Sequence, residues 1–137
     1  MSILHRVQES YQKNQDKDVI VTNLSDEVID VYLCSKEEAV LKDPVATPYY
    51  GDFTGSTPIV FWASDSEVLL DDSLIMFEKL KKEKVEIRLY LRKGMMHTWI
   101  IIPFLSESKE DLAILEADMK AALQRKLKGS QEIRYVV

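Results

Sequence analysis

Pro58-Ile59-Val60-Phe61-Trp62-Ala63 is an apolar run of the kind that forms a strand buried on both faces, as the interior of a parallel sheet requires. An acidic turn follows it, and apolar residues then recur at helical spacing over 71–83. The next run, 85–91, alternates apolar and polar residues, which predicts a half-covered or edge strand with one side in solvent. Parallel strands need a crossover of about a dozen residues or more. The sequence therefore predicts two parallel strands joined by a crossover helix.

Chemically useful side chains follow both of these strands. Asp65 and Glu67 come after the first strand, and the turn Gly94-Met95-Met96-His97 comes after the second. A right-handed crossover places the loops after its two strands at the same edge of the sheet. The acidic turn and the histidine are therefore expected to meet in space, although they lie far apart in the sequence.

Further helices and one further strand complete the prediction. The stretch 43–58 is rich in Pro and Gly and is expected to be a loop. In the last helix, one face carries an apolar stripe that is expected to be buried, formed by Leu112, Leu115, Met119, Ala122 and Leu123. The predicted fold class is α/β, a small and mainly parallel sheet with strands near 58–63 and 85–91 and a possible extra strand at 132–137, packed with helices near 24–34, 71–83 and 106–127.

The composition excludes several classes of function. A length of 137 residues suits a single domain, and a net charge of −5 argues against a nucleic-acid surface, which needs clustered Lys and Arg. No apolar stretch approaches the roughly 18 residues that a membrane span requires. One cysteine, Cys34, permits no disulfide within the chain and fits a reduced, cytoplasmic setting. With two histidines and one cysteine, neither a metal site nor a cofactor is expected.

Four blocks of sequence resemble the C-terminal portion of α/β-hydrolase esterases and lipases of the hormone-sensitive-lipase family. The blocks are 43–53, 58–60, 64–73 and 94–97; they recur in the family's order and spacing, and the likeness covers roughly residues 8–126. The resemblance implies a partial α/β-hydrolase fold for a single domain, 1–137. It also implies that Glu67, thirty residues before His97, occupies the position of the triad acid, with Asp65 as the alternative. A glutamate can hold the imidazole as an aspartate does.

The chain departs from this family in one respect that decides its chemistry. Such enzymes need a G-x-S-x-G nucleophile elbow and an oxyanion loop of His-Gly-Gly type. The four glycines, at 51, 55, 94 and 129, bracket no serine in that way, and no His-Gly-Gly occurs. Three serines could be considered as substitute nucleophiles, Ser64, Ser66 and Ser73, but their spacing does not support this role. A serine hydroxyl without an aligned base and oxyanion donors is inert. The chain alone is expected to be inactive.

Three functional interpretations follow from the resemblance and this departure. The chain can be the truncated C-terminal part of a carboxylic-ester hydrolase, a non-catalytic module, or one subunit of a split esterase that acts on small esters only when complemented. Without the family's preceding strands, strand 58–63 would expose unpaired backbone groups, which proteins cover or pair. The C-terminal strand 132–137 can fold back onto the sheet, two copies can join edge to edge, or a partner chain can supply the missing N-terminal half. Of these three, we expect a homodimer through this sheet edge.

Overall fold

The computed structural model describes residues 9–20, 31, 37–124 and 131–137 of the chain. Most of the helix expected near 24–34 lies outside these residues, as do His5 and Cys34. A short helix, α1 (Glu9–Asn14), lies in the stretch 1–18, which is irregular or weakly helical by its sequence pattern. A second short helix, α3 (Glu38–Leu41), precedes the Pro-rich loop, where no helix was predicted. That loop contains the 3-10 helix η3 (Pro48–Tyr50).

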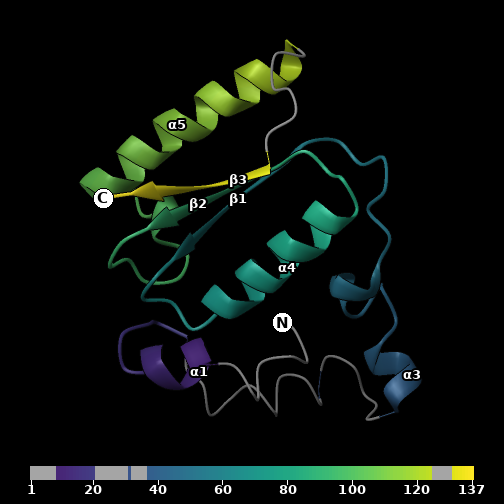
Figure 1. The fold of residues 1–137 in the computed structure, drawn as a ribbon. Coiled ribbons are helices and arrows are strands. Elements are labelled where there is room, and N and C mark those ends of the chain that lie inside the picture. Colours follow the sequence, from purple (N-terminus) through teal and green to yellow (C-terminus); the bar gives the residue numbers. More distant parts are fainter. Residues whose placement is uncertain (1–8, 21–30, 32–36, 125–130) are drawn as a thin grey trace.

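A three-stranded parallel sheet forms the centre of the fold (Figure 1). Its strands are β1 (Ile59–Ser64), β2 (Ile87–Arg92) and β3 (Gln131–Val136), in the spatial order β1-β2-β3. In the register, Phe61 lies beside Leu89, and Leu89 lies beside Ile133. The predicted α/β class, the parallel pairing and the extra C-terminal strand are confirmed.

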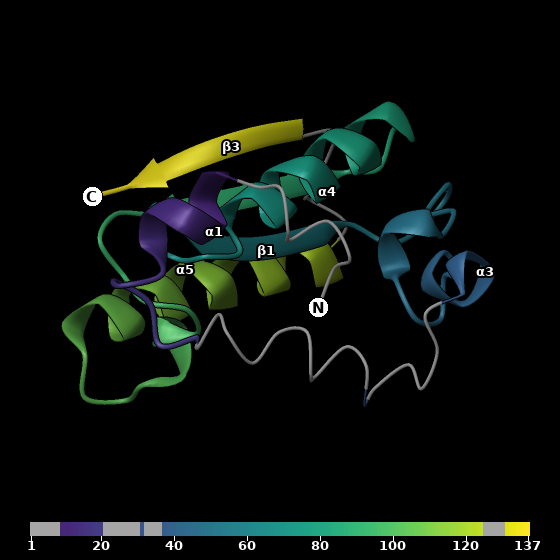
Figure 2. The same ribbon diagram turned by 90° about the horizontal axis from the view of Figure 1, so that it is seen from below.

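Two long helices cover opposite faces of the sheet (Figures 1 and 2). The crossover helix α4 (Leu70–Lys82) begins one residue before the predicted range and ends one residue before its predicted end. Its apolar side packs on one face of the sheet, where the core consists of Ala63, Phe77, Leu80, Val85, Ile87, Leu89 and Leu91. The second helix, α5 (Ser106–Leu123), follows the 3-10 helix η4 (Trp99–Ile101) and covers the other face.

The strand predicted to have one side in solvent is the middle strand of the sheet, so that expectation is wrong. Arg88 is 14% exposed at its side chain and Arg92 only 4%, because α5 covers the face on which they lie. Asp118 of α5 pairs with Arg88 at 2.5 Å and accepts a hydrogen bond of 2.8 Å from the hydroxyl of Tyr90. Charged residues become buried here because each has a partner, which lowers the free energy that desolvation would otherwise add.

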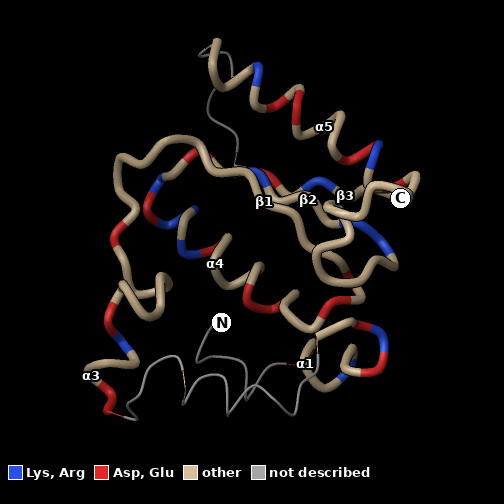
Figure 3. The backbone as a smooth tube through the Cα atoms, turned by 180° about the vertical axis from the view of Figure 1, so that it is seen from behind, with Lys and Arg blue, Asp and Glu red and all other residues tan. Residues whose placement is uncertain are grey.

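The stripe predicted to be the buried face of α5 is only partly buried, since Leu115 and Ala122 are half-buried and the other three members are exposed. Leu112, Met119 and Leu123 are 46%, 59% and 84% exposed, whereas Asp111 and Asp118 are buried against the sheet. Figure 3 marks the acidic residues along α5 and the basic residues on the strands beneath it. The sheet face presents the donors of Arg88, Tyr90 and Arg92, and the neighbouring η4 adds the indole N–H of Trp99. The helix α5 therefore turns its carboxylates inward to meet these donors rather than its leucines.

The outer edge of β1 has no strand beside it in the part of the chain that the structure describes. The backbone N–H of Ile59 donates to Glu86 O at the start of β2, so the alternation of a strand points the N–H groups of Val60 and Trp62 away from β2. The C-terminal strand β3 pairs with the far side of β2 and leaves this edge open. An apolar strand with an open edge is a site for pairing with another polypeptide.

Core packing between α4 and the sheet gives a first prediction. Replacing Leu80, which is 1% exposed, with Ala should lower the free energy of unfolding by about 2–5 kcal/mol, because it removes buried methyl groups and leaves a cavity. The same substitution at Leu123, which is 84% exposed, should change it by less than about 0.5 kcal/mol. Urea unfolding of both variants measures this difference, and equal losses of stability would contradict the packing described here.

Candidate functional site

The acidic residue at the centre of the site is Glu67, in the turn that follows β1. Its side chain is 3% exposed, and its backbone N–H reaches back to Ser64 O at 3.4 Å. Next to it, Val68 is fully buried and fixes the turn against the protein. Glu67 is thus a carboxylate held in a defined position away from water, which strengthens any charge interaction that it makes.

The histidine lies at the end of the turn that follows β2. Gly94 has a φ of +74°, a left-handed conformation that favours glycine, and it starts the reversal that brings His97 back over the sheet edge. The Nδ1 atom of His97 lies 3.0 Å from the Oε2 atom of Glu67, a distance at which Nδ1–H donates to the carboxylate. The His97 side chain remains one-third exposed. No described residue forms a hydrogen bond with its Nε2 atom, so the second ring nitrogen is open to another group.

The electrostatics of the pair follow from this geometry. The hydrogen bond to Glu67 raises the pKa of His97 above its ordinary value of 6.5, and the charges of Glu67 and Asp18 raise it further. Partial burial of the ring acts in the opposite direction, because it disfavours the charged form. The imidazole of His97 is therefore a stronger base than a free histidine, and its hydrogen bond to Glu67 stabilises its protonated form.

The alternative acid, Asp65, lies in the same turn but serves another purpose. Its Oδ1 atom accepts the backbone N–H of Gly94 at 2.7 Å and the hydroxyl of Ser66 at 3.0 Å. Ser64 acts in parallel, since its buried Oγ atom accepts the backbone N–H groups of Ser66 and Met95. These two residues tie the acidic turn to the start of the histidine turn. Ser64 is therefore structural and is not exposed as a nucleophile.

An apolar hollow of about 460 Å³ opens beside the Glu67–His97 pair. Its walls come from the outer edge of β1, from one side of α4 and from the loop before β1, and both members of the pair line it. The apolar lining residues are Pro48, Phe53, Ile59, Phe61, Trp62, Leu69, Met76 and Leu80. The open strand edge, the hollow and the paired side chains thus form one continuous surface.

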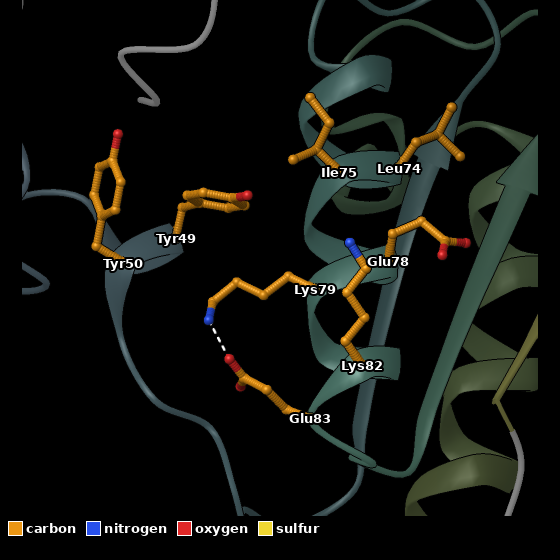
Figure 4. A pocket seen from close by; sticks show the side chains of 8 residues that line it. All are labelled: Tyr49, Tyr50, Leu74, Ile75, Glu78, Lys79, Lys82 and Glu83. Carbon is orange, nitrogen blue, oxygen red and sulfur yellow. Dashed lines mark hydrogen bonds and ion pairs between the residues drawn. The ribbon is translucent and has the colours of Figure 1, made fainter.

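A second hollow, of about 630 Å³, lies between η3 and the outer side of α4 (Figure 4). It shares no residue with the surface around His97. Its charged groups are of both signs, and Lys79 forms an ion pair with Glu83 across it. Lys79 also lies near the rings of Tyr49 and Phe53, which fastens the Pro-rich loop to α4. The hollow is thus bordered by contacts that hold the loop in place.

Residues that the sequence did not indicate also contribute to the site. Asp18 follows α1, and its carboxylate accepts the backbone N–H groups of His97 and Val68 at 2.7 and 2.8 Å. Asn14 donates to the backbone oxygens of Asp65 and Glu67. Residues 1–18 have no convincing apolar periodicity, so no pattern could have connected these two side chains with the site.

Neither a metal-binding cluster nor a membrane-spanning helix occurs among the residues that the structure describes. No cluster of three or more His, Cys, Asp or Glu side chains is arranged to hold a metal ion. No described helix combines the length and the apolar character that a bilayer-spanning segment needs.

Comparisons with known proteins identify the family to which the chain belongs. Residues 2–101 match the family model described as alpha/beta hydrolase fold, and the chain belongs to this family. No curated protein matches at a significant level. A crystal structure of an esterase/lipase from an uncultured bacterium is 25% identical, superposes with a TM-score of 0.74 and covers 85% of this chain.

Structures of the protein EstE5 are also similar. One with PMSF is 26% identical, with a TM-score of 0.73, and again covers 85% of this chain. Another, soaked with ethyl alcohol, is 24% identical with a TM-score of 0.76 and shares the fold. The chain covers 38% of the length of the first and second of these proteins and 39% of the third. It is thus related to esterases and lipases of the hormone-sensitive-lipase type, and it spans less than half of their length.

The contact between the carboxylate and the imidazole gives a second prediction. Glu67→Gln should lower the pKa of His97, because the hydrogen bond to Glu67 is the largest cause that raises it. An NMR titration of the ring protons measures the pKa directly, and since the chain has only two histidines, His5→Gln assigns the signals. Glu78→Gln, on the exposed side of α4, is the matched control and should leave the titration unchanged.

The same pair makes stability depend on pH. Because the folded-state pKa of His97 is raised, its contribution to the free energy of unfolding is fully present below about pH 6.5 and is lost as the pH rises through the folded-state pKa. Urea unfolding across this range should therefore show a larger loss of stability in the wild type than in Glu67→Gln. Parallel curves for the two proteins would contradict the pairing.

Proposed function

We propose that Glu67 and His97 are the acid and the general base of a serine esterase site whose serine is supplied from outside residues 1–137. The observation that carries this proposal is the 3.0 Å contact between Nδ1 and Oε2, made by a buried acid and a partly exposed histidine. Membership of a family that includes esterases and lipases supports it. The substrate class is a carboxylic ester.

The pair would act through the ring nitrogen that the acid does not occupy. With Nδ1–H donating to Glu67, the imidazole is held in the tautomer that leaves a lone pair on Nε2. Nε2 would take the proton of the serine hydroxyl as the oxygen attacks the ester carbonyl, and the carboxylate would stabilise the resulting imidazolium. His97 would then return the proton to the leaving alkoxide, and a second cycle with water would release the acid.

The chain by itself should not complete this reaction. Its 137 residues contain neither the G-x-S-x-G elbow nor an oxyanion loop of His-Gly-Gly type. Two serines of the acidic turn are engaged within the turn, since Ser64 is fully buried and Ser66 donates its hydroxyl to Asp65. Without an aligned nucleophile and oxyanion donors, the base has nothing to activate.

The open edge of β1 is the proposed place for the complementing segment. It adjoins the hollow that Glu67 and His97 line, so a strand added there would bring its own side chains beside Nε2. The related esterases are more than twice as long as this chain, which leaves ample length for such a segment. Main-chain hydrogen bonds to the edge and apolar contacts in the hollow would then hold it.

Complementation gives a third prediction. The chain alone should show no hydrolysis of a short-chain p-nitrophenyl ester above that of its His97→Ala variant. Addition of an N-terminal fragment of a related esterase that carries the elbow serine should restore turnover, and the rate should fall by about a thousandfold or more when His97 is replaced. A spectrophotometric assay of p-nitrophenolate release measures both.

Two controls make the outcome specific. His5→Ala removes the other histidine of the chain and should leave the complemented activity unchanged. Glu78→Gln removes an exposed carboxylate on α4 and should also leave the complemented activity unchanged. Hydrolysis by the chain alone that depends on His97, or complemented activity that survives its removal, would each contradict the proposed roles.

A non-catalytic homodimer is the second candidate, and the open edge of β1 is the observation that favours it. A two-fold axis beside this edge would pair β1 with its copy in antiparallel fashion and join two three-stranded sheets into one. The two candidates use the same edge, so an N-terminal esterase fragment that binds there should dissociate such a dimer.

The dimer gives a fourth prediction. Light scattering coupled to size-exclusion chromatography should give a mass of twice 15.8 kDa for the wild type. Val60→Pro removes an N–H group that points away from β2, so it should yield a folded monomer without breaking the β1–β2 hydrogen bonds. A wild-type chain that stays monomeric at high concentration would overturn the homodimer.

A further inference from the structure

One carboxylate outside the catalytic pair contacts the turns that carry both of its members. The Oδ1 atom of Asp18 accepts the backbone N–H of His97 at 2.7 Å and that of Val19 at 2.7 Å. Its Oδ2 atom accepts the backbone N–H of Val68, the residue after Glu67, at 2.8 Å. Asp18 is separated from these turns by fifty residues or more in the sequence, so only the fold brings it there.

Neighbouring residues of the same segment hold the acidic turn from its other side. The Nδ2 atom of Asn14, which is 1% exposed, donates to the backbone oxygens of Glu67 at 2.9 Å and Asp65 at 3.1 Å. The hydroxyl of Ser10 donates to Val68 O at 2.8 Å. Together with Asp18, these side chains satisfy backbone groups on both sides of Glu67, and they fix the segment 9–20 against the site.

We propose that Asp18 is a positioning residue that fixes the distance between Glu67 and His97 by holding the backbone of both turns with one carboxylate. Its consequence for catalysis rests on the proposed esterase function, but the positioning itself does not. Ser64 and Asp65 tie the start of the histidine turn to the acidic turn through Met95 and Gly94. Asp18 alone among the described side chains bonds the backbone of His97, at the end of that turn.

The chemistry of a carboxylate suits this role. Each of the two carboxylate oxygens accepts hydrogen bonds in the plane of the group. Because these oxygens are a fixed distance apart, Asp18 also fixes the distance between the N–H groups of Val68 and His97. Hydrogen bonds to an ionised acceptor are shorter and roughly twice as strong as neutral ones. A small displacement of either turn would lengthen the 3.0 Å contact between the acid and the imidazole, and hydrogen bonds weaken steeply with misalignment.

The negative charge of Asp18 also acts on His97 directly, and the test has to separate this effect from positioning. Loss of the charge alone lowers the pKa of His97, because Asp18 is one of the groups that raise it, after Glu67. Asp18→Asn removes the charge and also replaces one acceptor oxygen with an NH2 donor, so its side chain can accept from only one of the two turns. Asp18→Glu keeps the charge and both acceptor oxygens but moves them by one methylene, so this variant changes the geometry alone.

The experiment combines these variants with Glu67→Gln in NMR titrations of the full chain. If Asp18 positions the pair, Glu67→Gln lowers the pKa of His97 by less in the Asp18→Glu background than in the wild type, because the contact is already weakened. Amide exchange at Val68 and His97 should also become about tenfold faster or more in both variants. Asp16→Asn, an exposed aspartate of the same loop, is the matched control and should change neither readout.

Each outcome decides the proposal. If Asp18→Glu leaves the effect of Glu67→Gln at its wild-type size, Asp18 acts by charge only and the positioning role is overturned. Slow amide exchange at Val68 and His97 in both variants overturns it as well. If Asp18→Asn does not fold, as judged by circular dichroism, Asp18→Glu carries the test with Asp16→Asn as its reference. These measurements involve no ester hydrolysis, so failed complementation would refute the proposed function without affecting this result.

Discussion

The parallel pairing of β1 and β2 is the constraint on which the rest of the structure depends. Because α4 carries the chain back from one strand end to the start of the other, the turns after both strands meet at one edge of the sheet. Glu67 and His97 come from those two turns, and their 3.0 Å contact follows from this topology. Three further side chains hold the two turns together by accepting backbone N–H groups of the turn after β2; they are Asp65, Ser64 and Asp18.

The other face of the sheet is organised by charge. Asp118 of α5 bonds Arg88 and Tyr90, and Asp111 accepts the indole N–H of Trp99 at 2.8 Å. Burial raises the pKa of the Asp111 carboxyl, although the hydrogen bond from Trp99 opposes that shift. A polar interface of this kind fixes the helix in one orientation, because any other rotation would leave buried donors and acceptors unpaired. It also turns Leu112, Met119 and Leu123 toward solvent.

The open edge of β1 adjoins the hollow that Glu67 and His97 line. The chain is a member of the α/β-hydrolase fold family and spans 38% of the length of its esterase/lipase relative. It holds an acid–histidine pair in a geometry suited to general-base chemistry, and the edge of β1 next to that pair can accept a further strand. An edge that leads directly into an incomplete site is a physical reason to look for the nucleophile on a segment added there.

The fold class, the parallel strands and the crossover helix could be predicted from local periodicity alone, and so could the meeting of the acidic turn with His97. The choice of Glu67 over Asp65 as the acid came from the resemblance to the esterase family. Only the tertiary structure decided that β2 is the central strand, that α5 turns its carboxylates inward, and that Asp18 bridges the two turns. The reason is that periodicity reports which residues share a face, whereas the partner that covers this face is set by contacts between segments far apart in the chain. The alternating strand was therefore predicted correctly as an element and in the burial of its apolar face, but its polar face proved to be covered. The apolar stripe predicted the helix α5 correctly, but most of that stripe is exposed.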